Sequence, residues 1–234
     1  MKYCKRCIMP DTRPGLVLDD EGVCNACRWQ ESKTLIDWEA HRSQLQGIAD
    51  QARTNTYGSW DCVVGVSGGK DSTWQALFLR DEIGLNPLLV SYVGPDVTEI
   101  GRNNINNLSN LGFDVLSLKP NPRIARLLSK KSFYDFGNLV KYSDSALFPV
   151  PFRAAMAYKI PLVFFGENAA MEAGDKNTQG EGWDATKVIN NNTLSGHGTD
   201  IWVREDVTEK DLIPYRYPSV EEFKDWGGKG IFMG

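Results

Sequence analysis

The sequence predicts an α/β protein in which helices flank a parallel sheet and a small cysteine module precedes it. Three observations support this fold class. Short apolar runs alternate with helical periods after residue 60, two C-x2-C pairs stand within the first 27 residues, and a glycine-rich loop follows the first apolar run. Strands that alternate with helices favour a parallel sheet with right-handed crossovers.

The composition is that of an ordinary globular protein. The chain has 234 residues, 41% of them hydrophobic and 24% charged, with a net charge of −4. The sequence has no apolar run long enough for a transmembrane helix and no N-terminal signal-peptide pattern, so we expect a cytoplasmic protein without a membrane partner. The acidic balance disfavours a broad nucleic-acid surface, and we expect no nucleic-acid partner.

The first module is defined by four of the five cysteines. Cys4 and Cys7 form one C-x2-C pair, and sixteen residues later Cys24 and Cys27 form another. This spacing is typical of a structural zinc site, in which each pair turns two thiolates toward one ion. An iron–sulfur site is the alternative. Disulfides are disfavoured in the cytoplasm, and Cys62, beside an apolar run, is expected to be a buried thiol.

We divide the chain into a zinc module (1–30), a linker helix (31–60) and an α/β domain (61–234). The linker helix is expected from the spacing of Leu35, Trp38, Leu45 and Ile48. The chain ends in "GGKGIFMG", where an apolar stretch begins without an evident closing element. We therefore expect a further C-terminal region.

Periodicity places the elements of the α/β domain. Strands are expected at 63–66, 88–93, 115–118 and 162–165, and helices at 71–82, 98–111, 122–131 and 147–158. The expected inward residues are Trp74, Leu77, Phe78 and Ile83 on the first helix and Ile100, Ile105, Leu108 and Leu111 on the second. Residues 169–206 read as an active-site loop. Short helices are expected at 208–212 and 219–226, the latter with a capping box at Ser219 and Glu222.

Parallel sheets bind ligands beyond the carboxyl ends of their strands. Residues 67–72, 92–95 and 166–168 are therefore expected to line one crevice. The first of these segments, "SGGKDS", is not the P-loop of kinases and GTPases. That pattern requires glycine where Val64 stands and a hydroxyl where Asp71 stands. The alternative interpretation of this segment is an ordinary strand-to-helix turn without a ligand.

The segment resembles instead the PP-loop of the ATP pyrophosphatases, S-G-G-x-D-S, and matches it at every fixed position. The resemblance implies an adenine-nucleotide α-hydrolase-like fold, Mg²⁺, and cleavage of ATP between its α- and β-phosphates. Gly68 and Gly69 would let backbone N–H groups converge on pyrophosphate, with hydroxyl donors from Ser67 and Ser72. Lys70 would neutralise charge. Asp71 would cap the helix or help to place Mg²⁺.

The N-terminal "CKRCIMPDT" joined to this loop, with "IGRNNINNLSNLGFDV" and "VFFGENAAME", resembles the N-acetyl sugar amidotransferase family. That family converts a sugar acetamido group to an acetamidino group in lipopolysaccharide (O-antigen) or flagellar glycan pathways. The resemblance implies an acetamido sugar, in nucleotide-linked form, as the substrate. It also implies a separate glutaminase and an ammonia-channelling partner. Family members carry a further C-terminal region, so the resemblance also favours the expectation of such a region.

The chemistry is consistent with this reaction. The amide oxygen attacks the α-phosphate, pyrophosphate leaves, and ammonia then displaces AMP to give an amidine. Such an enzyme mainly positions groups and stabilises charge, so it needs no protein nucleophile. The sequence offers no persuasive glutaminase nucleophile of its own, because four cysteines are committed and only His41 and His197 could form a Cys–His pair.

The expected catalytic residues are Asp71, Lys70, Asn168 and Glu167. Nucleotide contacts are expected from the 67–72 loop and from Tyr92, Val93 and Gly166. More distant candidates are Asn103, Asn104, Asn106 and Asn107, and Lys176, Glu181, Asp184, Lys187 and His197. Two other functions stay open: a tRNA-thiolating PP-loop enzyme, which should carry further catalytic cysteines or a basic face, and an inactive nucleotide-binding scaffold.

Overall fold

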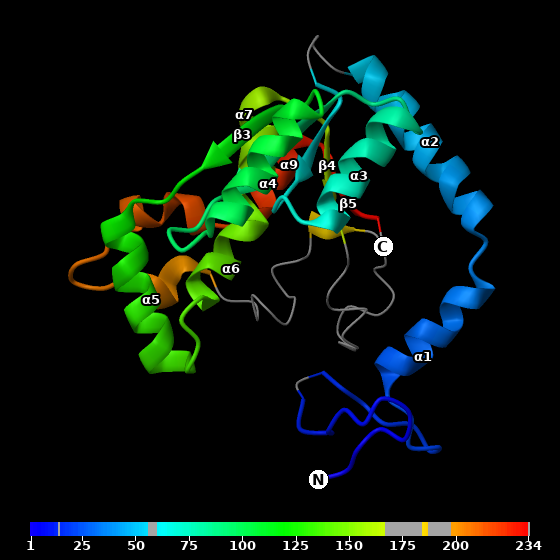
Figure 1. The fold of residues 1–234 in the computed structure, drawn as a ribbon, viewed down its shortest axis with the longest axis horizontal. Helices are drawn as coiled ribbons and strands as arrows, with labels where there is room; N and C mark the ends of the chain where they lie inside the picture. The colour runs from blue at the N-terminus through cyan, green and yellow to red at the C-terminus, as the bar shows by residue number, and fades with distance from the viewer. Residues whose placement is uncertain (14, 56–59, 167–183, 187–197, 234) are drawn as a thin grey trace.

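The computed structural model describes residues 1–13, 15–55, 60–166, 184–186 and 198–233 (Figure 1). Its centre is a five-stranded sheet of order β3-β2-β1-β4-β5 in which all neighbours are parallel. The strands are β1 (Cys62–Gly65), β2 (Pro87–Tyr92), β3 (Asp114–Leu118), β4 (Leu162–Phe165) and β5 (Lys229–Phe232). The predicted parallel sheet is confirmed, and β5 forms where the sequence indicated only an apolar stretch.

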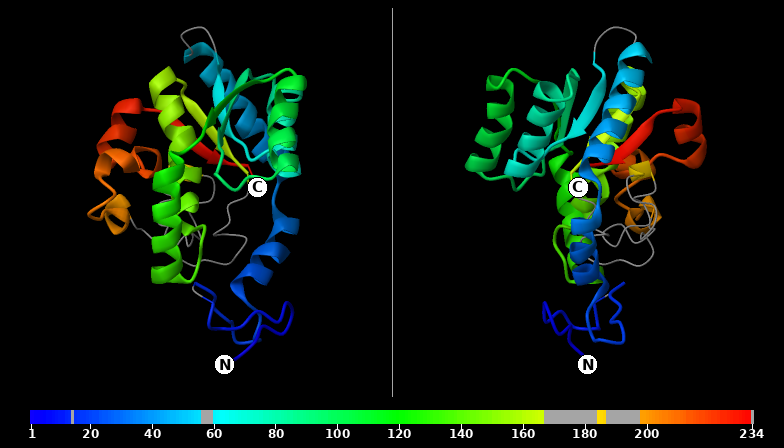
Figure 2. Two further views of the ribbon diagram at one scale, coloured as in Figure 1. Left: turned by 60° about the vertical axis from the view of Figure 1, so that its left-hand side comes forward. Right: turned by 90° about the vertical axis from the view of Figure 1, so that its right-hand side faces the viewer.

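Helices cover both faces of this sheet (Figure 2). One face carries α2 (Trp38–Asn55), α3 (Lys70–Asp81) and α4 (Glu99–Asn110). The other carries α5 (Pro122–Phe136), α6 (Lys141–Leu147), α7 (Pro149–Tyr158), η3 (Thr199–Trp202), η4 (Glu209–Tyr215) and α9 (Val220–Trp226). The result is a three-layer α/β/α arrangement.

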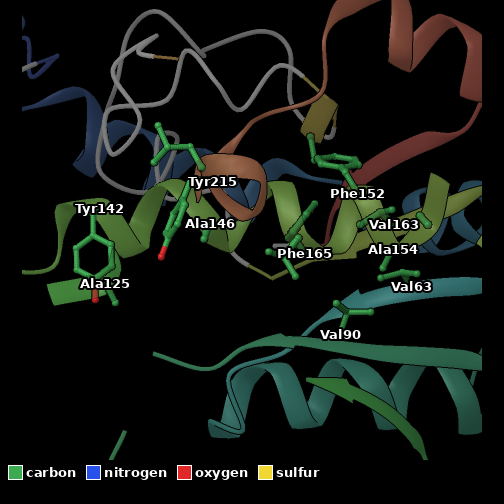
Figure 3. Close-up of a cluster of buried hydrophobic side chains, with 14 of the residues drawn as sticks. Val63, Val90, Ala125, Tyr142, Ala146, Phe152, Ala154, Val163, Phe165 and Tyr215 are labelled. Atoms are coloured by element: carbon green, nitrogen blue, oxygen red, sulfur yellow. The ribbon is translucent and has the colours of Figure 1, made fainter. Parts of the chain in front are cut away.

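Successive residues of the central strand enter different cores. Val63 packs under α7 with Val90, Phe152 and Phe165, as Figure 3 shows. Val64 faces the opposite way and joins the core beneath α2, α3 and α4. Because both faces of the sheet are buried, its central strands read as continuous apolar runs rather than alternating ones.

The inward stripe of α3 differs from the predicted one. Trp74 was expected inside, but 59% of its surface is exposed. Ala76 and Leu79 are fully buried instead, and Ile83 just beyond the helix is buried too. Leu77 and Phe78 pack against this core as predicted but are only partly buried, so the fully buried face lies about one residue away from the predicted one.

Two other helices have narrower buried faces than their apolar residues predicted. On α4, Ile105 and Leu108 are buried, whereas Ile100 is 73% exposed in the first turn and Leu111, just past the helix, is also exposed. Of the residues expected to define the linker helix, Leu45 and Ile48 are partly buried, but Leu35 and Trp38 are exposed. The exposed apolar residues lie at or near the ends of their helices rather than in the middle, where the helices pack on the sheet.

Some elements were not predicted. The sequence did not predict α1 (Asn25–Ser32) or α6, and the linker expected as one helix over 31–60 is divided into the single-turn η1 (Lys33–Leu35) and α2. The expected active-site loop at 169–206 falls mostly outside the described residues, but its end forms η3, where Trp202 is 1% exposed. The expected helix at 208–212 is the 3-10 helix η4. The predicted capping box at Ser219 and Glu222 is confirmed.

The helix α2 packs on the α/β domain as well as leading to it. Ala49 and Ala52 are buried in the core beneath α3. Arg53 donates through Nη1 to the carbonyl oxygens of Ile83 and Gly84, each at 3.1 Å. The N-terminal cysteine module lies apart from the sheet, on the side where β5 ends, and α1 and α2 connect the two (Figures 1 and 2). The division into domains stays a prediction.

Among the helices in the described part of the chain, none combines the length and the apolar character needed to span a membrane.

Candidate functional site

The loop after β1 requires a glycine at position 68. Val66 continues the strand by donating its backbone N–H to the carbonyl of Val90 at 2.9 Å. Gly68 then turns the chain with a φ of +79°, a conformation that is unfavourable for other residues. A Cβ at this position would lie 3.0 Å from the backbone nitrogen of Ile105 in α4. The first glycine of the motif is thus needed for both conformation and space.

The two serines of the loop shape it from within. Ser72 accepts a hydrogen bond at its Oγ from the N–H of Ser67 at 3.3 Å and donates to the carbonyl of Gly69 at the same distance. The hydroxyl of Ser67 in turn accepts from the N–H of Gly69 at 3.3 Å. These bonds are long, so the hydroxyls can exchange them for an anion at modest cost.

The loop leads directly into the N-terminus of α3. Gly69 is the N-cap residue and no side chain caps the helix there. The first-turn N–H groups and the helix dipole therefore favour an anion at this end. Lys70 and Asp71 form an ion pair of 2.6 Å, but their side chains are 88% and 64% exposed. Such an exposed pair is worth little, so both side chains can turn toward a ligand.

The strand order places this loop at the switch point of the sheet. From β1 the chain proceeds outward to β2 and β3, and then returns to add β4 and β5 on the other side. Ligands of open α/β sheets bind at the carboxyl ends of the strands where this order reverses. Ser67 lies two residues past the end of β1, and Val93 and Gly166 directly follow β2 and β4. These three predicted positions thus lie at the ends of adjacent strands.

Tyr92, a predicted nucleotide contact, lies in a group of tyrosines that the sequence did not indicate. Its hydroxyl is 3.3 Å from that of Tyr215 in η4, and Tyr142 lies against Tyr215 with ring centroids 6.0 Å apart. Burial raises the pKa of Tyr92 and of Tyr215, and it raises the pKa of Tyr142 to about 12. All three hydroxyls are therefore neutral near pH 7. No local signal points to Tyr215, since it is 123 residues from Tyr92.

The remaining candidates are only partly located. The asparagines of α4 are exposed, and the carbonyl carbon of Asn104 would lie 3.2 Å from a Cβ on Gly68. Asp184 accepts from the backbone N–H of Thr186 at 2.9 Å and from its hydroxyl at 2.6 Å, which makes it a turn-forming residue. Glu167, Asn168, Lys176, Glu181, Lys187 and His197 lie outside the described residues.

The four cysteines of the N-terminal module come together as predicted. Their sulfur atoms all lie within 4.8 Å of one another. The Sγ atoms of Cys4 and Cys27 are 3.9 Å apart, and those of Cys7 and Cys24 are 3.6 Å apart. Four thiolates at the usual Zn–S distance of about 2.3 Å form a tetrahedron with edges of about 3.8 Å. The cluster could therefore hold a metal ion, and its dimensions fit zinc.

The surroundings of the cysteines shift their pKa values in different directions. Cys4 accepts at its Sγ from the N–H of Arg6 at 3.4 Å and from that of Cys24 at 3.2 Å. Backbone hydrogen bonds, from Cys7 above all, lower the pKa of Cys4 to about 6. Burial acts in the other direction on Cys24 and Cys27 and raises the pKa of each. Ile8 adopts a φ of 56°, which completes the turn after the first pair.

The fifth cysteine has no catalytic environment. Cys62 is fully buried in the core beneath α3, and burial raises the pKa of its thiol well above the ordinary value. Reactive cysteines need a lowered pKa and some exposure. The expectation of a buried structural thiol is confirmed.

Comparison with known proteins gives no family. No family model matches the chain, and no curated protein matches it. Solved structures that are similar at low identity include the following two. A predicted subunit of tRNA methyltransferase from Methanocaldococcus jannaschii is 14% identical with a TM-score of 0.38, covering 74% of this chain and 66% of its own. NMN synthetase from Francisella tularensis is 15% identical with a TM-score of 0.42, covering 82% of this chain and 93% of its own. At such low identity and TM-score, neither structure supports a conclusion about this chain. The fold assignment rests on the observed strand order.

Proposed function

We propose that this protein is an ATP-dependent, AMP-forming amidotransferase that converts the acetamido group of a sugar to an acetamidino group. The observation that carries the proposal is the Ser67–Ser72 loop, which joins the central strand to an uncapped helix at the switch point of a parallel sheet. Its sequence resembles the PP-loop. The N-terminal cysteine cluster, with the motif around it, favours the sugar amidotransferases within that group.

The loop would bind the pyrophosphate portion of ATP. The N–H groups of the first turn of α3 would donate to its oxygens, with Lys70 as the neutralising cation. Asp71 is exposed beside this position and would hold Mg²⁺, which supplies further charge neutralisation when bound. The adenosine would lie toward Tyr92 and Val93 at the end of β2. The substrate would then approach the α-phosphate from the β4 side.

The chain's own residues would orient the reactants and exclude water. The amide oxygen forms a bond to the α-phosphorus while the bond to the pyrophosphate oxygen breaks. Ammonia then adds to the activated carbon, a proton leaves, and AMP departs with the original amide oxygen. Cys4, Cys7, Cys24 and Cys27 would hold a structural zinc away from this chemistry, because four thiolates leave no open position for a reacting group.

The nitrogen would come from a partner. Of the five cysteines in the sequence, four form the cluster and Cys62 is buried. A cysteine-dependent glutaminase therefore finds no nucleophile in this chain, and a separate glutaminase with an ammonia-channelling subunit would supply ammonia. The same buried Cys62 counts against tRNA thiolation, which the sequence left open.

ATP–pyrophosphate exchange tests the proposal. The protein is assayed with Mg²⁺ and a panel of nucleotide-linked acetamido sugars, with and without ammonium. We expect pyrophosphate exchange that depends on one of the sugars. We also expect a product whose mass reflects replacement of oxygen by NH. If no sugar elicits exchange or AMP formation, the amidotransferase function is wrong. If transfer RNA elicits AMP formation instead, the chain is a tRNA-modifying enzyme. If ATP binds but neither substrate elicits turnover, it is a nucleotide-binding scaffold.

A further inference from the structure

Gln75 is a buried polar residue on α3. Only 6% of its surface is exposed. Its Oε1 has no hydrogen-bond partner within the described residues. By contrast, the buried hydroxyl of Ser132 accepts from the N–H of Tyr142 at 3.1 Å. Burying an amide oxygen without a partner is unfavourable, so such an atom in a folded protein calls for an explanation.

The position of Gln75 suggests one. It lies on α3 one turn after Asp71, so the two side chains project from the same face of the helix. At the other end its amide group lies against Gly166. A Cβ added to Gly166 would be 2.6 Å from Nε2 and 3.3 Å from Oε1 of Gln75. The amide group therefore lies between the loop helix and the carboxyl end of β4.

Gly166 is itself held in place. Its carbonyl oxygen accepts from the N–H of Met233 at 3.2 Å, which joins it to the segment after β5. Ser91 also carries a buried, unpaired hydroxyl oxygen in the described structure, but it lies within β2, on the opposite side of β1. Of these two atoms, the Gln75 oxygen is the one on the β4 side of the loop.

The acetamido sugar would bind on the β4 side of the loop. This inference rests on the proposed function. The loop occupies the end of β1, and the predicted nucleotide contacts Tyr92 and Val93 follow β2. The acetamido group must then reach the α-phosphate from the direction of β4. An acetamide presents one donor, its N–H, and one acceptor, the carbonyl oxygen that attacks phosphorus.

We propose that Gln75 recognises the substrate by accepting a hydrogen bond at Oε1 from the N–H of the acetamido group. When the amide oxygen bonds to the α-phosphorus and pyrophosphate leaves, the amide becomes an imidate whose nitrogen keeps its proton and gains positive charge. The hydrogen bond to Gln75 therefore strengthens as the reaction proceeds, and no proton is transferred. Such a contact stabilises the transition state more than the ground state.

Exchange assays on Gln75→Met and Gln75→Glu test this role. Methionine is similar in length and accepts hydrogen bonds poorly, whereas glutamate keeps an oxygen acceptor. With the acetamido sugar, Gln75→Met should lower kcat/KM for exchange by about 10- to 100-fold, with the KM for ATP within about twofold of the wild type. Gln75→Glu should recover much of that loss. Gln51→Met, an exposed glutamine on α2, is the matched control and should change nothing.

A substrate analogue gives the readout that a merely structural role would not move. An N-methylated acetamido sugar lacks the N–H. The wild type should strongly prefer the parent sugar, and Gln75→Met and Gln75→Ala should lose most of that preference. If the wild type catalyses pyrophosphate exchange but the variants prefer the parent sugar over the N-methylated one as strongly as the wild type does, the role of Gln75 is wrong and the proposed function stands. Absence of exchange in the wild type with any acetamido sugar overturns the proposed function, and this inference with it. If Gln75→Met fails to fold, Gln75→Ala and the wild-type preference decide.

Discussion

At the scale of single residues, Gly68 is the position where loop geometry is least replaceable. Gly68→Ala would place a side chain at a φ of +79° and 3.0 Å from the Ile105 nitrogen. We expect a loss of stability of about 1–2 kcal/mol from the conformation alone, together with weaker ATP binding. Urea unfolding and nucleotide titration measure the two effects.

Gly47 provides the control. It lies in α2 with nothing within 4 Å of an added Cβ. Gly47→Ala should stabilise the protein by about 0.5–1 kcal/mol, because alanine favours a helix. If both substitutions have the same sign, the strain assigned to position 68 is wrong.

Asp71 is the residue whose charge the proposed site uses most directly. Asp71→Asn should lower pyrophosphate exchange by about 100-fold or more, because a group that stabilises charge in the transition state is lost. Asp81→Asn, at the other end of the same helix, removes a similarly exposed carboxylate and should stay within about twofold of wild type. Comparable losses in both variants would argue for a general effect of charge on α3.

At the scale of elements, the cysteine module is predicted to depend on a metal ion for its folding. Cys7→Ser removes one member of the cluster, and we expect bound zinc to fall from about one ion per chain to none after dialysis. Limited proteolysis should then cleave within residues 1–30 while the sheet persists. Cys62→Ala is the matched variant and should retain the ion, because that thiol is buried far along the chain. Zinc retained by Cys7→Ser would contradict the four-thiolate site.

The capping box of α9 is predicted to make stability depend on pH. Glu222 accepts from the N–H of Ser219 at 2.8 Å and pairs with Arg153, and these contacts lower its pKa. A carboxylate with a lowered pKa stabilises the fold above its unfolded pKa of about 4.3, and that contribution is lost as pH falls through the folded value.

Urea midpoints therefore should differ between wild type and Glu222→Gln at pH 7, and the difference should shrink toward pH 3. Loss of the cap itself in Ser219→Ala should cost about 1 kcal/mol. Glu205→Gln, at an exposed turn position, is the control. If the difference in urea midpoint between the wild type and Glu222→Gln does not vary with pH, the carboxylate charge is not involved.

At the scale of the whole molecule, stability rests on the two cores that the sheet separates. Phe152 of α7 is fully buried, with the rings of Phe165 and Phe223 at 5.2 Å and 5.0 Å between centroids. Phe152→Ala should cost about 3–5 kcal/mol in urea unfolding, from lost burial and the cavity left behind. Phe133→Ala, where the ring is 52% exposed, should stay within about 0.5 kcal/mol. Equal losses of stability in the two variants would show that Phe152 does not belong to the core that stabilises the fold.

Local patterns were sufficient for much of the fold and part of the site. The cysteine spacing predicted the cluster because each C-x2-C pair is a local turn. The strand, loop and helix around residues 63–81 were predicted because a buried run, two glycines and a helical period follow one another directly. The capping box at Ser219 and Glu222 was equally local. In each case the pattern that gave the prediction is local, although the two cysteine pairs themselves meet across 17 and 23 residues of chain.

The tertiary structure decided what depends on distant residues. The order β3-β2-β1-β4-β5 sets which loops are neighbours, and no single segment encodes it. The packing of α3 on the sheet leaves Trp74 exposed and buries Ala76, and the hydroxyl of Tyr215 reaches that of Tyr92 across 123 residues of chain. The contact of Gln75 with Gly166 likewise exists only once β4 lies beside β1. The sequence by itself thus determined most of the elements and the loop at residues 67–72, whereas burial between distant segments decided which side chains surround that loop.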